Sequence, residues 1–265
     1  MHHDDALLAR AGARRGAPAS YARLAELQRA WCFAQPFHNL DLLAGARRGA
    51  PPLDREAALA RCAAGLGGPC HVQSWGFLSL LRLVGYEARL CGASISAPDD
   101  HLLVHVAIGA AAYLCDVGNG HPYLTPFPLD RVHEQHHVGW HVRSVPDGDE
   151  LVVSRRSPDQ PAWRVVYRAS PAARTWEDFA GAIERHHREP GFGPFLSGLR
   201  VVRVDPSSMT AVRDAQVITY REGGFDRERL DEAELVDFIA GDLGLAALPV
   251  KAAVAAWRDA RAARP

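Results

Sequence analysis

The sequence has little of what marks membrane, nucleic-acid-binding or disulfide-rich proteins. Its five cysteines lie at irregular spacings without a C-x-x-C pair, which favours a reducing compartment over a disulfide framework. The formal net charge of −1 gives no general attraction to nucleic acid or to anionic lipid. No apolar run approaches the ~20 residues of a membrane span, and the polar first residues do not resemble a signal peptide. We therefore expect a cytoplasmic protein with no nucleic-acid or membrane partner.

The hydrophobic pattern changes twice along the chain, near residues 86 and 200. Of the 265 residues, 48% are hydrophobic and 23% are charged, which is typical of a globular protein with a substantial core. Apolar residues follow helical spacing before residue 86, alternate as in strands up to about 200, and show both patterns afterwards. We predict an α+β fold with a helical bundle at 1–85, an antiparallel sheet or barrel at 86–200, and an α/β part at 201–265 that ends in a helix at 246–262.

Cys70 has the local sequence of a reactive thiol at the start of a helix. Gly67-Gly68-Pro69 precede it, and apolar residues from Phe77 to Val84 then recur at the spacing of one helical face. The free N–H groups and the dipole of a helix N-terminus lower the pKa of a thiol from about 8.5, and they can also stabilise an oxyanion. The pattern favours Cys70 as a nucleophile; the alternative is a cysteine that only packs beside Phe77.

Two histidines and an aspartate are candidates to complete a nucleophilic triad. His101 and His105 lie on one face of a predicted strand, because side chains alternate along a strand. A turn near residues 109–110 would place Asp116 opposite Leu103, diagonal to both histidines. Strand geometry does not choose between the two histidines, and a structural histidine beside a turn aspartate is the alternative.

The chain resembles the arylamine N-acetyltransferases. Members of that family carry Pro-Phe-Glu-Asn-Leu-Asp, then Arg-Gly-Gly-x-Cys, then a histidine and then Asp-Val-Gly. The resemblance extends weakly to the end of the chain. The matching segments are Pro36-Phe37-His38-Asn39-Leu40-Asp41, Gly67-Gly68-Pro69-Cys70, His101-Leu102-Leu103, Asp116-Val117-Gly118, Trp176-Glu177-Asp178-Phe179 and Pro190 to Phe195.

The resemblance implies a triad of Cys70, His101 and Asp116, arranged as in cysteine proteases, and it favours His101 over His105. It implies a helical bundle that carries the thiol, a β-barrel that carries the histidine and the aspartate, and an α/β lid. The implied reaction moves an acyl group from an acyl-CoA or acyl-carrier-protein thioester to a small-molecule amine, with no tightly bound cofactor and no metal. Backbone N–H groups near Cys70 and at Val117–Gly118 are the implied oxyanion donors. The candidate substrate-binding residues are Phe37, His38, Pro69, Gly118 and Asn119.

Several positions depart from the family pattern. The family's arginine before Gly-Gly is replaced by a leucine and the glutamate of its Pro-Phe motif by a histidine, so a charged pair is lost together. These departures favour a divergent member that forms amides in natural-product biosynthesis. The alternatives are an amide or macrolactam synthase, a thioester hydrolase, or a catalytically decayed binding module. The departing positions are His38, Leu66, Val72, Ser74 and Asn119.

Two further histidine clusters need an interpretation. His133-Glu134-Gln135-His136-His137 matches the H-E-x-x-H pattern of helical zinc sites. Nearby Pro128 and Gly139 and the missing apolar face argue against a helix here, so we expect a solvated loop. We also expect the pair His186-His187 to face solvent on a helix.

Overall fold

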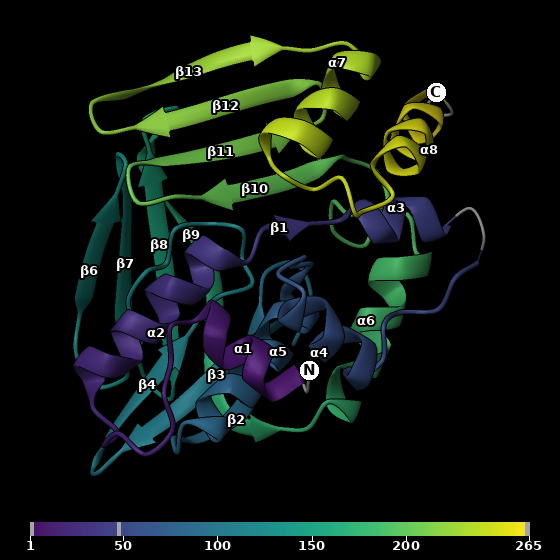
Figure 1. Ribbon diagram of the computed structural model, residues 1–265. Helices are drawn as coiled ribbons and strands as arrows, with labels where there is room; N and C mark the ends of the chain where they lie inside the picture. The colour runs from purple at the N-terminus through teal and green to yellow at the C-terminus, as the bar shows by residue number, and fades with distance from the viewer. Residues whose placement is uncertain (1–2, 47–48, 263–265) are drawn as a thin grey trace.

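The computed structural model describes residues 3–46 and 49–262, and helices dominate up to residue 83. Ser20 and Asp54 accept hydrogen bonds from backbone N–H groups in the first turns of the second and fourth helices, so side-chain caps set where these helices begin. The Asp54 cap confirms the predicted helix start. The helices are α1 (His3–Arg10), α2 (Tyr21–Ala34), α3 (Leu40–Ala46), α4 (Arg55–Ala63) and α5 (Cys70–Leu83), shown in Figure 1.

Helix α5 lies at the centre of this helical part and is buried on nearly all sides. Its side chains from Cys70 to Phe77 are buried except for Trp75, which is partly exposed. Trp31 of α2 packs against Phe77 with ring centroids 5.5 Å apart. The Ser74 hydroxyl donates a hydrogen bond to the carbonyl of Leu102, 2.8 Å away, so the helix is fixed to the strand that follows it in the fold.

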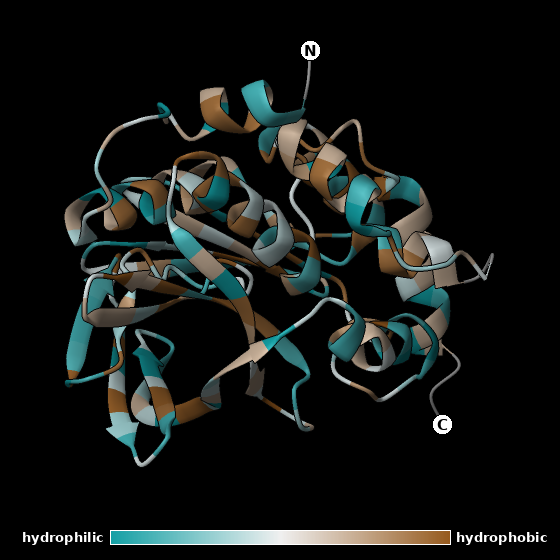
Figure 2. Ribbon diagram, turned by 90° about the horizontal axis from the view of Figure 1, so that it is seen from below, coloured by the Kyte–Doolittle hydropathy of each residue, from teal (hydrophilic) through white to brown (hydrophobic). Residues whose placement is uncertain are grey.

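Within the described residues, strands β2 to β9 form an eight-stranded antiparallel sheet in the order β5-β4-β3-β2-β9-β8-β7-β6, a nearly closed barrel. Hydrophobic and hydrophilic residues interleave along these strands (Figure 2), as expected where one face is buried inside the barrel. The strands are β2 (Glu87–Ser94), β3 (His101–Ile108), β4 (Ala111–Cys115), β5 (Phe127–Pro128), β6 (His133–His137), β7 (Trp140–Asp147), β8 (Glu150–Ser157) and β9 (Gln160–Arg174).

Side chains of β6 bridge the gap between the two edge strands of the barrel. Gln135 of β6 accepts hydrogen bonds from the backbone N–H groups of Leu124 and Thr125, at 2.7 and 2.9 Å, just before β5. Its amide donates to the Thr125 carbonyl at 3.0 Å, and His133 Nε2 lies 2.9 Å from the Thr125 hydroxyl. These bonds occupy backbone groups that would otherwise stay unpaired between the edges.

The sequence interpretation of residues 133–137 as a solvated loop was wrong, because they form strand β6 paired with β7. On a strand, His133 and His137 lie about 13 Å apart along the chain direction, too far to share a metal as they would on a helix. The described residues contain no group of three or more His, Cys, Asp or Glu side chains that could hold a metal ion.

The chain after residue 176 first forms a short helical segment and then a second sheet that includes residues from the start of the chain. Strand β1 (Phe37–His38) pairs with β10, so the second sheet has the order β1-β10-β11-β12-β13. Helices α7 and α8 lie beside it in Figure 1. The elements are η1 (Glu177–Phe179), α6 (Ala180–Arg188), β10 (Arg200–Val204), β11 (Ser208–Arg213), β12 (Gln216–Arg221), β13 (Gly224–Arg229), α7 (Glu232–Asp237), η2 (Phe238–Asp242) and α8 (Val250–Ala262).

The last helix begins at Val250 and not at residue 246 as predicted. Pro249 immediately precedes it, and the Pro249 carbonyl accepts the first backbone hydrogen bond of the helix from Ala253. No helix among residues 3–46 and 49–262 is long and apolar enough to cross a bilayer. The structure confirms the mixed helix-and-sheet class with an antiparallel barrel.

Candidate active site

Cys70 is the first residue of α5 and lies at the wall of a cavity of about 300 Å³. Pro69 precedes it in an extended conformation, with φ −74° and ψ 178°, and caps the helix without a side-chain hydrogen bond. The first N–H groups of an α-helix have no acceptor within the helix, so those of Cys70, His71 and Val72 surround the thiol as potential donors. The side chain is only 3% exposed, yet it borders the cavity.

Two glutamines that the sequence did not single out hold the turn before Cys70. Gly67 has φ +63°, a conformation that favours glycine, and its N–H donates to the side-chain oxygen of Gln35 at 3.1 Å. The Gln73 amide donates to the carbonyls of Pro36 and Gly68, both at 3.1 Å. Both glutamines are buried, so the start of α5 is fixed by hydrogen bonds inside the protein.

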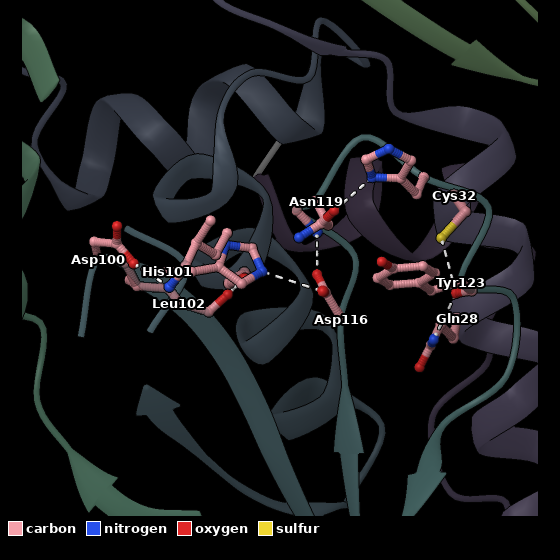
Figure 3. A network of polar contacts seen from close by, with 12 residues as sticks. Gln28, Cys32, Asp100, His101, Leu102, Asp116, Asn119 and Tyr123 are labelled. Carbon is pink, nitrogen blue, oxygen red and sulfur yellow. Dashed lines mark hydrogen bonds and ion pairs between the residues drawn. The ribbon is translucent and has the colours of Figure 1, made fainter. Parts of the chain in front are cut away.

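His101 and Asp116 come together at the ends of the neighbouring strands β3 and β4. The Nε2 atom of His101 lies 3.1 Å from Oδ2 of Asp116, and both side chains are buried (Figure 3). Val104 pairs with Cys115, so Asp116 follows directly opposite Leu103, as the sequence predicted. With Nε2 directed at Asp116, the Nδ1 atom is the ring nitrogen that remains for Cys70.

The surroundings of His101 favour its protonated form. Burial, the largest single influence, lowers the pKa of His101, but the charge and hydrogen bond of Asp116 and the side chain of Cys70 outweigh it. Together they raise the pKa to about 10, so the imidazole is a cation at neutral pH. A protonated imidazole beside a thiol favours the thiolate through charge attraction.

His105 is on the same strand face but has different neighbours. It pairs across the sheet with Arg89 on one side and Leu114 on the other, and its Nδ1 atom has no hydrogen-bond partner in the described structure. Burial and then the charge of Arg89 lower the pKa of His105. The structure therefore separates the two histidines that strand geometry alone left equivalent, and it is His101 that lies beside the aspartate.

Gly118 brings the loop after β4 into direct contact with α5. A Cβ atom at this position would lie 2.6 Å from the Cys70 Cα atom, closer than atoms pack. The Gly118 N–H donates to Oδ1 of Asp116 at 3.1 Å (Figure 3). This N–H is therefore already engaged, which corrects the expectation that it is an oxyanion donor. The N–H groups of the first turn of α5 remain.

Three of the five predicted substrate-binding residues border the cavity: Phe37, Gly118 and Asn119. Pro69 does not, because it caps α5 behind the thiol. His38 does not either: it is fully buried, and its Nε2 atom lies 2.8 Å from the carbonyl oxygen of Leu66. Its expected contact with substrate is corrected to a structural contact with the turn before Cys70.

The cavity wall includes residues that the sequence did not point to. Asp100 organises the loop before His101 by accepting hydrogen bonds from three backbone N–H groups of residues 95–97, at 2.7 to 2.9 Å. Arg155 gave a weak signal, since it continues the inward two-residue spacing of Leu151 and Val153 in strand β8. Such a signal cannot be read until the strand itself is placed. The main further residues are Ser96, Asp100, Arg155, His186, Phe195, Arg200 and Arg213.

His186 is buried at this wall and does not face solvent, which corrects the sequence interpretation. Its ring packs between Phe192 and Phe195, with centroids 4.6 and 4.8 Å away, and its Nε2 atom lies 3.2 Å from the Asp100 carbonyl oxygen. His187 is partly buried. The chain after α6 folds back over this helix, and local helical spacing contains no sign of that.

The family model of N-acetyltransferases matches residues 20–249. The arylamine N-acetyltransferase of Mycobacterium smegmatis is 25% identical, with a TM-score of 0.78 over 94% of this chain and 96% of that one. The Mycobacterium marinum enzyme in complex with CoA is 23% identical, with a TM-score of 0.82 over 97% and 99%. The Salmonella typhimurium enzyme is 20% identical, with a TM-score of 0.82 over 100% and 99%. No curated protein sequence matches the chain. Because the family model covers most of its length, the chain belongs to the N-acetyltransferase family and is an N-acyltransferase.

Proposed function

We propose that this enzyme transfers an acyl group from a CoA thioester to a small-molecule amine through an acyl-enzyme on Cys70. One observation carries the proposal: Cys70 and His101 border the same cavity, with Asp116 3.1 Å behind the imidazole. This is the arrangement of nucleophile, base and orienting group that covalent acyl transfer requires, as in cysteine proteases.

The first half-reaction follows from the ion pair. The Cys70 thiolate attacks the thioester carbonyl carbon, and the developing oxyanion receives hydrogen bonds from the first-turn N–H groups of α5. The bond between the carbonyl carbon and the CoA sulfur then breaks. The departing sulfur takes the proton of the His101 imidazolium, which leaves an acyl group on Cys70 and a neutral imidazole.

The second half-reaction uses the imidazole as a base. The amine nitrogen attacks the acyl carbon of Cys70 while His101 accepts an N–H proton. The bond to the Cys70 sulfur breaks, the amide leaves, and the thiolate–imidazolium pair is restored. Asp116 remains hydrogen-bonded to the ring throughout and stabilises the charged form.

We favour CoA over a carrier protein as the donor. The structurally similar Mycobacterium marinum protein has been solved with CoA. The departures from the family pattern at His38 and Leu66 contact each other in the interior and do not border the cavity. Of the five departing positions, Asn119 alone lies at the cavity wall, so the altered residues give little reason to replace the donor. Amide formation in biosynthesis is then a question of which amine fits beside Asn119.

Single substitutions test the proposed roles. Cys70→Ala and His101→Ala are each expected to lower turnover with acetyl-CoA and an arylamine by about a thousandfold or more, because each removes a group on which both half-reactions depend. His105→Ala is the matched control on the same strand face and should retain most activity. Activity lost in His105→Ala and kept in His101→Ala would overturn the assignment.

Thioester hydrolysis and an inactive binding module are tested by the same protein preparations. A hydrolase would release free CoA at the same rate with and without an amine, whereas a transferase releases it faster when the amine is added. An ion-paired thiolate should react with iodoacetamide near neutral pH far faster than an ordinary thiol. Slow alkylation of Cys70 would favour the binding module.

A further inference from the structure

Arg155 of β8 places a positive charge in the wall of the cavity that contains Cys70. Its guanidinium lies over the ring of Trp140, 5.1 Å from the ring centroid. Most of the side chain is shielded from solvent, and burial lowers the pKa of Arg155 from its usual range, although the group remains a cation at neutral pH. A buried cation normally has an acidic partner, because removing a charge from water is unfavourable.

Arg155 has no such partner among residues 3–46 and 49–262. No carboxylate lies within ion-pair distance, and its Nη1 atom has no hydrogen-bond acceptor. Asp159 is the nearest acid that influences it, but this carboxylate already faces Arg213 at 3.7 Å and Arg227 at 3.6 Å. The local balance is therefore three cations around one anion.

The other groups near Arg155 do not supply the missing negative charge. His121 also borders the cavity, and burial, together with the charges of Arg155 and Arg213, holds the pKa of His121 well below its usual value. This histidine is therefore neutral. Arg200, a third arginine at the cavity wall, is paired with Asp214 at 3.0 Å. Arg155 is the cavity arginine whose charge is left without an acid.

We propose that Arg155 is a specificity-determining residue that binds a carboxylate carried by a substrate in the catalytic cavity, either on the transferred acyl group or on the amine. The inference rests on the proposed function for the identity of the two substrates. A cavity of about 300 Å³ accommodates a small acyl group or amine, and it is at the lower end of the range for small-ligand sites. The nucleotide of CoA does not fit within it, so the anion that Arg155 meets belongs to the reacting end of a substrate.

Direct binding tests the site without relying on catalysis. Calorimetric titration of Cys70→Ala protein with benzoate should show binding, and its neutral isostere benzamide should bind roughly tenfold or more weakly. Adding Arg155→Gln should remove this preference. Arg156→Gln is the matched control, because Arg156 is the next residue of β8, is exposed and does not border the cavity. Arg155→Lys, which keeps the charge, should retain part of the preference.

Equal affinity for benzoate and benzamide in the Cys70→Ala protein would overturn the proposal, and so would an unchanged preference in the Arg155→Gln variant. The first comparison needs no variant at Arg155, so it stands even if that variant does not fold. Because no turnover is involved, an Arg155-dependent preference would also survive a failure of the acyl-transfer proposal.

Kinetic comparisons then identify which substrate carries the anion. N-acetylcysteamine thioesters lack the phosphates of CoA, so succinyl and butyryl thioesters of this type compare a carboxylated with a neutral acyl group. Aminobenzoate and aminobenzamide give the same comparison for the amine. The selectivity ratio of one pair should fall about tenfold in Arg155→Gln and not in Arg156→Gln. If Arg155→Gln instead weakens 4′-phosphopantetheine binding and leaves both ratios intact, the residue binds the carrier phosphate and the proposal is wrong.

Discussion

At the scale of single residues, the segment Pro36-Phe37-His38-Asn39-Leu40-Asp41 connects distant parts of the protein. Phe37 borders the cavity, and His38 contacts the carbonyl of Leu66 before the nucleophile. Asn39 donates to the carbonyls of Phe195 and Gly198 at 2.7 and 2.6 Å, which fixes a loop at the cavity wall. Asp41 pairs with Arg61 of α4. Neighbouring residues in this segment therefore have different structural roles.

The pH dependence of stability should reveal His38. Its Nδ1 atom accepts from the Leu40 N–H while Nε2 faces the Leu66 carbonyl, so the neutral ring satisfies both contacts. Burial lowers the pKa of His38 to about 4, below its usual value near 6.5. The unfolded chain therefore binds a proton first as the pH falls, and up to roughly 3 kcal/mol of stability should be lost between pH 6.5 and 4.

A non-titrating side chain isolates this effect. Urea denaturation of His38→Gln should show a smaller loss of unfolding free energy than wild type between pH 6.5 and 4, because glutamine can make similar contacts without binding a proton. His136→Gln on the exposed side of β6 serves as the control and should follow the wild-type curve. Parallel curves for wild type and His38→Gln would show that His38 does not contribute.

Residues with a motif were predictable and residues defined only by tertiary contacts were not. Cys70 and Asp116 lie next to glycines whose spacing is readable in the chain, and the geometry brings His101 to Asp116. Arg155 is one arginine among many in the sequence and acquires meaning only when its strand forms the cavity wall. The proposed substrate role of His38 was wrong because adjacency in a motif does not fix the direction of a side chain.

At the scale of elements, the site depends on how closely the loop after β4 approaches the start of α5. Gly118 contacts the Cys70 backbone and also bonds to Asp116, so one residue aligns the helix with the strand pair. On the other side, Gln73 of α5 holds the turn at Gly68. The nucleophile and its partners come from separate elements, and these close contacts maintain their relative positions.

Gly118→Ala should damage activity much more than stability. The added Cβ atom would lie 2.6 Å from Cys70 Cα and 2.9 Å from Cys70 Cβ, so the loop or the helix must shift. Shifts of this size between reacting groups typically lower kcat/KM by about a hundredfold. Gly181→Ala in α6 is the control, because no atom lies near its added Cβ. Wild-type kcat/KM in Gly118→Ala would show that this contact does not position the thiol.

Element types followed from local periodicity except where pairing decided them. The strands β3 and β4 and their turn were predicted in the correct register, because alternation and a glycine turn are local signals. Residues 133–137 were misread because His, Glu and Gln are not typical strand residues, and their pairing with β7 made them a strand. The delayed start of α8 shows how Pro249 overrode helical spacing.

At the scale of the whole molecule, residues far apart in sequence join the helical part, the barrel and the second sheet. Phe37 pairs with Val202 and His38 with Val201, so the first part of the chain contributes an edge strand to the second sheet. Leu40 and Leu43 of α3 pack in the same core as residues of α7 and α8. Periodicity predicted pattern changes near residues 86 and 200, but pairing over such separations leaves no local signal. The three-part division stays a prediction.

The near closure of the barrel should contribute measurably to stability. Gln135→Ala removes the bonds to Leu124 and Thr125 and leaves two partly buried N–H groups without their acceptor. We expect the free energy of unfolding in urea to fall by about 1–3 kcal/mol. Glu134→Ala, at an exposed neighbouring position of β6, should change it far less. Equal losses in the two variants would argue that the Gln135 bridge does not hold the edges together.

The most direct test of the account is the intact mass of the protein after exposure to acetyl-CoA without an amine. The account predicts a gain of one acetyl group in wild type and in His105→Ala, none in Cys70→Ala, and loss of the adduct when an arylamine is added. An adduct that persists in Cys70→Ala, or a wild-type protein that never gains mass from any acyl thioester, would contradict the covalent role of Cys70.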